Sequence, residues 1–134
     1  MAKTKIFISF DYEHDSDIKN SLVYQSTNQE SPFSINDYSI KEPIDEKWKS
    51  VARDKIKGSD IVIFLCGEHT GDALGVAAEM SITQELTKPY FLLKGRRKVK
   101  VQKPKNAKKS DEIVNWKWKQ IDSKIKQLLK IKGE

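Results

Sequence analysis

The sequence predicts an α/β domain built on a doubly wound, mainly parallel sheet. Residues 61–65 (IVIFL) form a short, uninterrupted apolar run rich in β-branched residues, which is typical of a strand buried on both faces. Mostly apolar runs also occur at residues 5–10 and 90–93. Segments with helical periodicity separate these runs, and such alternation favours parallel strands joined by right-handed crossovers.

The N-terminal stretch predicts a strand, a turn and a helix. Residues 5–10 (KIFISF) are the first strand, and the polar residues 11–15 are the turn that follows it. Ser16 is a candidate N-cap for the first helix. The apolar face of that helix consists of Ile18, Leu22 and Val23.

The next stretch predicts a second strand and a second helix. Residues 33–35 are a short candidate strand. Pro43 breaks any regular element at its position, so we expect the helix to begin near Asp45 and to end at Gly58. The apolar stripe of this helix consists of Trp48, Val51, Ala52 and Ile56.

The C-terminal half predicts two further helices. The first runs from near Ala73 to about Leu86, and its buried face comprises Val76, Ala77 and Met80. The second is an amphipathic helix at about residues 115–131, capped by Asp111 or Asn115, with an apolar stripe of Trp118, Ile121, Ile125, Leu128 and Leu129. Between them we expect a strand at 90–93 and a weak edge strand at Val99 and Val101. The three tryptophans, Trp48, Trp116 and Trp118, are predicted to be core residues.

The composition predicts one cytoplasmic domain over residues 1–134. No apolar run is long enough to span a membrane, and the N-terminal apolar run is too short for a secretory leader. The single cysteine excludes an internal disulfide and fits a reducing compartment. With one cysteine and two histidines, a structural zinc site is not expected, and we predict no metal and no cofactor.

The positive charge lies in one segment. Residues 94–109 contain nine Lys and Arg residues and no acidic residue, which leaves 16 basic against 19 acidic residues elsewhere. Such a segment attracts phosphates, so binding of nucleic acid is one interpretation. The segment has no aromatic residue on which bases could stack, and we interpret it as a solvated connection.

Glu79 is the main candidate for a catalytic group. The predicted strand 61–65 ends at Cys66 and Gly67, and Glu79 follows about two turns into the next helix. Ligands of open α/β sheets bind at the carboxyl ends of the strands, so this carboxylate can project into a cleft whose rim includes residues 68–72. The alternative is a solvent-facing glutamate, which the residues alone favour because glutamate is a good helix former.

Two other clusters have both a plain and a functional interpretation. Residues 11–15 could bind ribose hydroxyls or a cation, although a polar turn is the simpler interpretation. Cys66 could be a nucleophile activated by His69, but a buried, inert cysteine is favoured. Gly67, Gly71 and Gly75 match no phosphate-binding glycine motif.

Several segments together resemble the Toll/interleukin-receptor (TIR) domain-like family, in particular the short bacterial and archaeal proteins of the Thoeris anti-phage type. KIFISFDYEHD resembles the first strand and its loop, and FSINDYS resembles the second strand with its Asp-x-Ser element. KWKSVARDKIKGSDIVIFLCGEHT resembles the helix and central strand. Thr70 and Glu79 keep the nine-residue spacing of the family's loop threonine and helix glutamate. The resemblance covers about residues 4–95.

The resemblance implies a flavodoxin-like, three-layer α/β/α fold with a five-stranded, mainly parallel sheet. It also implies NAD as a substrate that is cleaved at the nicotinamide–ribose bond, with an ADP-ribose-derived signal as the product in anti-phage defence. The catalytic glutamate corresponds to Glu79. The implied substrate-binding residues are Phe7, Ser9, Phe10, Asp11, Asp37 and Thr70. The family commonly has Trp-Val where this chain has Gly75-Val76, so we expect the helix to start with less packing.

Three alternatives to NAD cleavage stay open at this point. The first is a non-catalytic TIR-like signalling module that associates with its own copies, since members of the family can act as scaffolds. The second is an enzyme that resembles nucleoside deoxyribosyltransferases, which share the fold and a catalytic glutamate. The third is nucleic-acid binding through residues 94–109, which predicts an affinity that depends steeply on salt.

Overall fold

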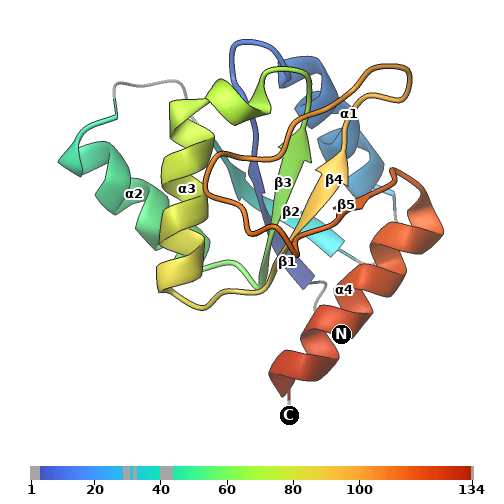
Figure 1. Ribbon diagram of the computed structural model, residues 1–134. Coiled ribbons are helices and arrows are strands. Elements are labelled where there is room, and N and C mark those ends of the chain that lie inside the picture. The colour runs from blue at the N-terminus through green and yellow to red at the C-terminus, as the bar shows by residue number, and fades with distance from the viewer. Residues whose placement is uncertain (1–3, 29–30, 32, 40–43, 134) are drawn as a thin grey trace.

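Strands and helices alternate along most of the chain (Figure 1). The computed structural model describes residues 4–28, 31, 33–39 and 44–133. The elements are β1 (Thr4–Ser9), α1 (Ser16–Ser26), β2 (Phe33–Tyr38), α2 (Glu46–Lys57), β3 (Ile61–Cys66), the short 3-10 helix η1 (Thr70–Asp72), α3 (Leu74–Glu85), β4 (Tyr90–Lys94), β5 (Ile113–Val114) and α4 (Trp118–Gly133).

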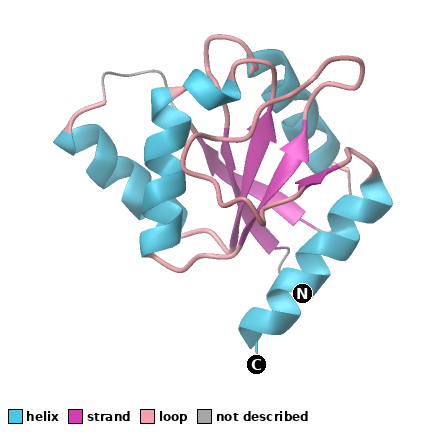
Figure 2. Cartoon of the chain, in the orientation of Figure 1, coloured by secondary structure: helices cyan, strands magenta, loops and turns pink. Residues whose placement is uncertain are grey.

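The five strands form one sheet in the order β2-β1-β3-β4-β5, and every neighbouring pair is parallel (Figure 2). This is the strand order of flavodoxin-like folds, in which the direction of winding reverses between β1 and β3. The predicted fold class is therefore confirmed, and the sheet is entirely parallel. All six residues of the central strand β3 are buried, as its apolar sequence predicts.

Helices cover both faces of the sheet and produce a core on each side. Along β1 and β3 successive side chains point to opposite faces. One core combines alternate strand residues such as Ile6 and Ile63 with Leu22 of α1 and Ile121 of α4. The other combines the intervening strand residues with Trp48 of α2 and Met80 of α3. Figure 1 shows α2 and α3 together on one side of the sheet and α1 and α4 on the other.

The second strand and the two helices beside it differ in detail from the sequence prediction. β2 extends to Tyr38 rather than ending at Ile35. Asp15, not Ser16, is the N-cap of α1, and its side chain makes no capping hydrogen bond. The Ser16 hydroxyl donates to the Tyr12 carbonyl oxygen. In α2, Val51 is partly exposed, while the other residues of the predicted stripe are buried.

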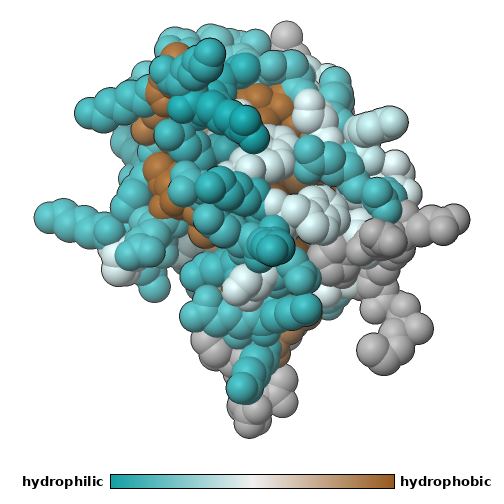
Figure 3. All heavy atoms as spheres, turned by 90° about the vertical axis from the view of Figure 1, so that its right-hand side faces the viewer, coloured by the Kyte–Doolittle hydropathy of each residue, from teal (hydrophilic) through white to brown (hydrophobic). Residues whose placement is uncertain are grey.

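The C-terminal part holds the largest departures. The edge strand is at Ile113–Val114, where it pairs with β4, and not at Val99 and Val101. α4 begins at Trp118, whose side chain is 38% exposed, so the prediction of a core tryptophan is wrong there. Trp48 is buried and Trp116 is partly buried. On the side of the molecule that includes α4, hydrophilic side chains cover most of the surface (Figure 3).

Residues 95–112 form a long connection, here called the strap, that lies against α3 and the loop after β3. The Gln102 amide N–H donates to the Gly67 carbonyl oxygen at 2.9 Å, and the Gly71 amide N–H donates to Gln102 Oε1 at 2.9 Å. Asn106 Nδ2 donates to the Ala77 carbonyl oxygen at 3.0 Å. Uncharged groups thus hold the middle of the strap in place, and at its start Arg96 forms ion pairs with Asp15 and Asp17. Among the described residues, no helix is long and apolar enough to cross a membrane.

Candidate active site

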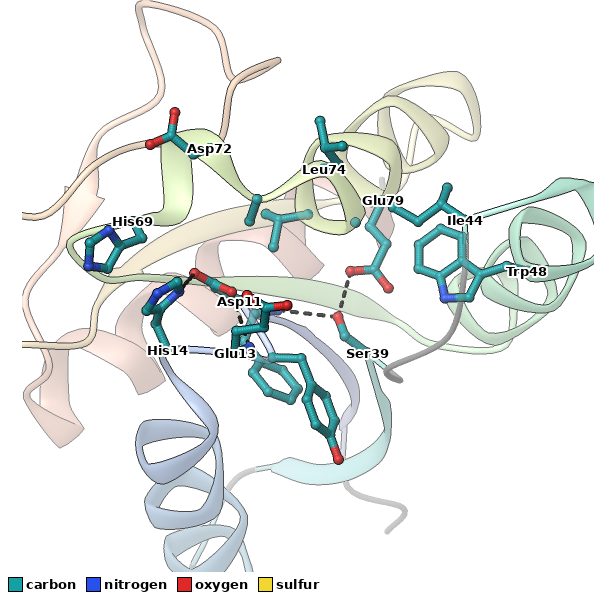
Figure 4. A pocket seen from close by; sticks show the side chains of 15 residues that line it. Asp11, Glu13, His14, Ser39, Ile44, Trp48, His69, Asp72, Leu74 and Glu79 are labelled. Carbon is teal, nitrogen blue, oxygen red and sulfur yellow. Dashed lines mark hydrogen bonds and ion pairs between the residues drawn. The ribbon is translucent and has the colours of Figure 1, made fainter.

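Glu79 lies on α3 with its carboxylate turned toward the ends of β1 and β2. Its side chain is only 1% exposed, so the solvent-facing interpretation is wrong. Ser9 at the end of β1 donates its hydroxyl to Glu79 Oε1 at 2.7 Å, and the Ser39 hydroxyl donates to the same oxygen at 2.5 Å (Figure 4). Two hydroxyl groups from different strands therefore fix the orientation of one carboxylate.

The surroundings of Glu79 change its acidity. Burial raises the pKa of its carboxyl group to about 7, because a charged carboxylate is poorly solvated there. The hydrogen bonds from Ser39 and Ser9, and then the positive charge of Lys55, act in the opposite direction and lower the pKa. Glu79 can consequently exchange a proton near neutral pH.

A cleft of about 460 Å³ opens beside Glu79. One end is largely apolar and the other end is polar, with the histidines on the polar side (Figure 4). Its lining residues are Phe10, Asp11, Tyr12, Glu13, His14, Ser39, Ile44, Trp48, His69, Asp72, Ala73, Leu74, Gly75, Val76 and Glu79.

The topology explains why these residues meet. Asp11 follows β1, Ser39 follows β2 and His69 follows β3, so all three come from the carboxyl ends of adjacent parallel strands. This edge, at the point where strand order reverses, is where open α/β sheets bind ligands. The predicted rim at residues 68–72 is present in part, since His69 and Asp72 line the cleft.

The residues expected to bind substrate occupy different places. Phe10 and Asp11 line the cleft. Ser9 contacts the Glu79 carboxylate. Phe7 is buried and, together with Glu79 and residues of α2, lines a small cavity of about 10 Å³. Asp37 is in β2, opposite Phe7, and its side chain lies outside the described part of the structure.

Thr70 is fully buried and is absent from the residues that line the cleft. Its Oγ1 accepts a hydrogen bond from the Gly67 amide N–H at 2.8 Å. The hydroxyl thereby closes the turn between β3 and η1. The structure places Thr70 in the support of the rim and not at its surface.

The space beside Gly75 is occupied from another helix. A Cβ atom added to Gly75 would meet Trp48 at 3.8 Å and Ile44 at 3.9 Å, both ordinary van der Waals contacts. The buried indole ring of Trp48 in α2 therefore packs near the start of α3, where the family commonly has its own tryptophan. α3 is helical from Leu74 onward, with Trp48 beside Gly75, while Leu74 itself is 69% exposed.

The polar end of the cleft contains an acid and two histidines. His14 Nδ1 lies 2.7 Å from Asp11 Oδ2. The rings of His14 and His69 are in contact, with their centroids 4.1 Å apart and their planes tilted by 31°. These two rings come from the loops after β1 and β3. Within the described residues, no group of three or more potential ligands is arranged to hold a metal ion.

Cys66 has no catalytic surroundings. Its thiol is fully buried, and burial raises the pKa of the thiol to about 12. Its sulfur contacts the Phe64 carbonyl oxygen, while the His69 ring contacts the His14 ring. A thiolate nucleophile is therefore disfavoured, in agreement with the interpretation of Cys66 as a buried, inert residue.

Sequence reasoning did not give several residues of the site their roles. Ser39 is the serine of the Asp-x-Ser element, but its contact with Glu79 joins positions 40 residues apart. Trp48 was predicted only as a core residue, although its ring also forms a wall of the cleft. His14 was considered only as one member of the polar turn 11–15. No local pattern in the sequence connects these residues to Glu79.

Comparisons with known proteins agree with this geometry. Residues 7–108 match the family model described as Thoeris protein ThsB, TIR-like domain. Among solved structures, a crystal structure of a prokaryotic SEFIR domain is similar, with a TM-score of 0.53 and 17% sequence identity over 94% of this chain and 90% of that chain. At this identity the likeness concerns the fold alone. No curated protein matches significantly.

Proposed function

The chain belongs to the Thoeris ThsB TIR-like family, and on that premise we propose that it cleaves NAD at the bond between nicotinamide and ribose. The observation that supports this most is the position of Glu79. It is a buried carboxylate with one oxygen held by two serine hydroxyls, and it lies in the wall of a cleft. The family's catalytic glutamate corresponds to this residue.

The proposed cleavage requires a negatively charged group beside the ribose. Nicotinamide leaves NAD as a neutral molecule, and the ribose that remains passes through a state with oxocarbenium character. An ionised Glu79 would stabilise the positive charge that develops there and would accept hydrogen bonds from the ribose hydroxyls. Ser9 and Ser39 keep the carboxylate oriented, so little reorganisation is required during the reaction.

The apolar end of the cleft suits the leaving group. Trp48, Ile44 and Leu74 line the cleft beside Glu79 (Figure 4). Gly75, which has no side chain, lies between them at van der Waals distance from Trp48 and Ile44. A flat heterocycle such as nicotinamide can lie against an indole ring and aliphatic side chains. This arrangement would place the glycosidic bond close to the carboxylate.

We infer from the family that the ADP-ribosyl product serves as a signal in anti-phage defence. The acceptor of the ADP-ribosyl group is water or another nucleophile. Resolution of the products by chromatography and mass would identify it.

Glu79→Gln tests the proposal. The substitution keeps the side chain's size and one oxygen for the serine hydroxyls, but it removes the negative charge. We expect nicotinamide release from NAD to fall by about 100- to 1,000-fold, the usual loss when one group that stabilises the transition state is removed. The assay uses concentrated protein, with and without extract of phage-infected cells.

Glu68→Gln is the matched control. Glu68 is an exposed residue of the loop between β3 and η1, and it is absent from the lining of the cleft. This variant should release nicotinamide at the wild-type rate. Equal release by the wild-type protein and Glu79→Gln would refute the role of Glu79. No release by folded wild-type protein under either condition would favour a non-catalytic module that associates with its own copies.

A further inference from the structure

Both histidines of the chain lie at the polar end of the cleft, across from Trp48 (Figure 4). We propose that His14, oriented by Asp11, is the general base that takes the proton from an acceptor hydroxyl group. This inference rests on the proposed cleavage of NAD. It assigns the second half of the reaction, in which the ribose is transferred, to a residue other than Glu79.

The contact between Asp11 and His14 fixes which ring nitrogen is available. An ionised carboxylate only accepts hydrogen bonds, so the 2.7 Å contact with Asp11 Oδ2 requires a proton on His14 Nδ1. In the neutral ring, Nε2 then has a free lone pair. Nε2 has no hydrogen-bond partner among the described residues, and the His14 side chain is 46% exposed. The same relation of acid, ring and free nitrogen orients the base in serine hydrolases.

Other contacts hold this pair in place. The amide N–H of Glu13 donates to Asp11 Oδ1 at 3.2 Å, so both oxygens of the carboxylate are engaged. The Asp11 side chain is only 10% exposed. On the other side, the His69 ring contacts the His14 ring at a tilt of 31°. Asp11 thus holds the Nδ1 edge of the imidazole, His69 lies against the ring, and the Nε2 edge is free.

The step balances without a further reagent. The bond between nicotinamide and ribose C1′ breaks, and its electron pair leaves with the neutral nicotinamide. A lone pair of the acceptor oxygen forms the new bond to C1′, and the proton of that hydroxyl moves to His14 Nε2. The imidazolium that results is stabilised by Asp11 and afterwards loses its proton to solvent.

The placement of the two groups suits this division of roles. Glu79 and His14 lie in the same cleft, with Asp11 between them (Figure 4). Glu79 is buried at the apolar end, where the leaving group would lie, and His14 is at the end that water reaches. Two separate groups, one that stabilises the departing side of the sugar and one that activates the attacking water, are an established arrangement for the cleavage of glycosidic bonds.

A comparison of two acceptors, water and nicotinamide, shows whether His14 is a general base or has only a structural role. Water must lose a proton when it attacks C1′, whereas isotopically labelled nicotinamide attacks through a ring nitrogen that has no proton. For His14→Gln we expect hydrolysis of NAD to fall by about 100-fold or more, the usual contribution of a general base. Exchange of labelled nicotinamide into NAD should continue at the wild-type rate.

Glu68→Gln is again the matched control, because Glu68 is exposed and is absent from the lining of the cleft. It should keep both rates close to those of the wild-type protein. Asp11→Ala should lower hydrolysis more than exchange, since it removes the group that orients His14. We expect His14→Gln to fold normally, because the His14 side chain is 46% exposed. Circular dichroism checks this.

Each remaining outcome is decisive. If His14→Gln lowers both rates equally, His14 supports binding and is not a base. If neither rate changes, or if the wild-type product joins ribose to a nitrogen atom, the inference is also wrong while NAD cleavage stands. A wild-type protein that shows neither hydrolysis nor exchange overturns both the inference and the proposed function.

Discussion

The burial of Glu79 lowers the free energy of unfolding by an amount that increases with pH. Its pKa is raised from 4.5 to about 7 by burial, so the folded protein binds this proton more tightly than the unfolded chain does. The stability of the fold therefore decreases as the pH rises from the unfolded pKa through the folded one. A carboxylate kept in such a place despite its cost is consistent with a functional role.

This cost predicts a difference between Glu79→Gln and the wild-type protein. The neutral amide has no proton to lose, so the variant should avoid a penalty of about 3 kcal/mol that the wild-type protein incurs above neutral pH. Urea denaturation at about pH 5 and about pH 8 measures this. The free energy of unfolding of Glu79→Gln relative to wild type should increase between these two conditions. An unchanged difference would mean that the pKa of Glu79 is not raised.

Glu79 and Thr70 show that the sequence can identify candidate site residues but cannot predict their contacts. Glu79 could be selected as a candidate from its place after the central strand and from the family resemblance. Its burial could not, because the serines that bind it are 70 and 40 residues away in the chain. The spacing of Thr70 was visible in the sequence, but the role of its hydroxyl in closing a turn depends on the fold.

At the scale of elements, local patterns predicted most helices and strands because each carries its own signal. α2 is an example. Asp45 precedes the first turn, its side chain accepts a hydrogen bond from the Trp48 amide N–H at 2.8 Å, and Gly58 is the C-cap. Trp48, Ala52 and Ile56 are buried on one face. The two-residue strand β5 has no such signal, since its pairing with Leu92 and Leu93 depends on where the strap returns to the sheet.

The N-cap of α2 gives a prediction at this scale. Asp45→Ala should lower the free energy of unfolding by about 1 kcal/mol, because the Trp48 amide N–H loses its acceptor at the start of the helix. Asp54→Ala is the control, since Asp54 is exposed near the C-terminal end, where a negative charge does not favour the helix dipole. Chemical denaturation should show a loss only for Asp45→Ala. Equal losses would mean that the cap contributes nothing specific.

At the scale of the whole molecule, the strap joins parts that the sequence does not connect. Arg96, at its start, forms ion pairs with Asp15 and Asp17, and Gln102 and Asn106 hold the loop after β3 and the helix α3. The sequence indicated a basic, solvated connection. It could not indicate that the uncharged residues within this segment support the rim of the cleft.

A crystal structure of the Glu79→Gln variant with NAD tests most directly whether the cleft beside Glu79 is the substrate site. We expect the nicotinamide to lie against Trp48, the ribose hydroxyls to contact residue 79, and His14 to face the ribose from the polar end of the cleft. NAD bound elsewhere, or a cleft without NAD at saturating concentration, would show that this cleft is not the substrate site.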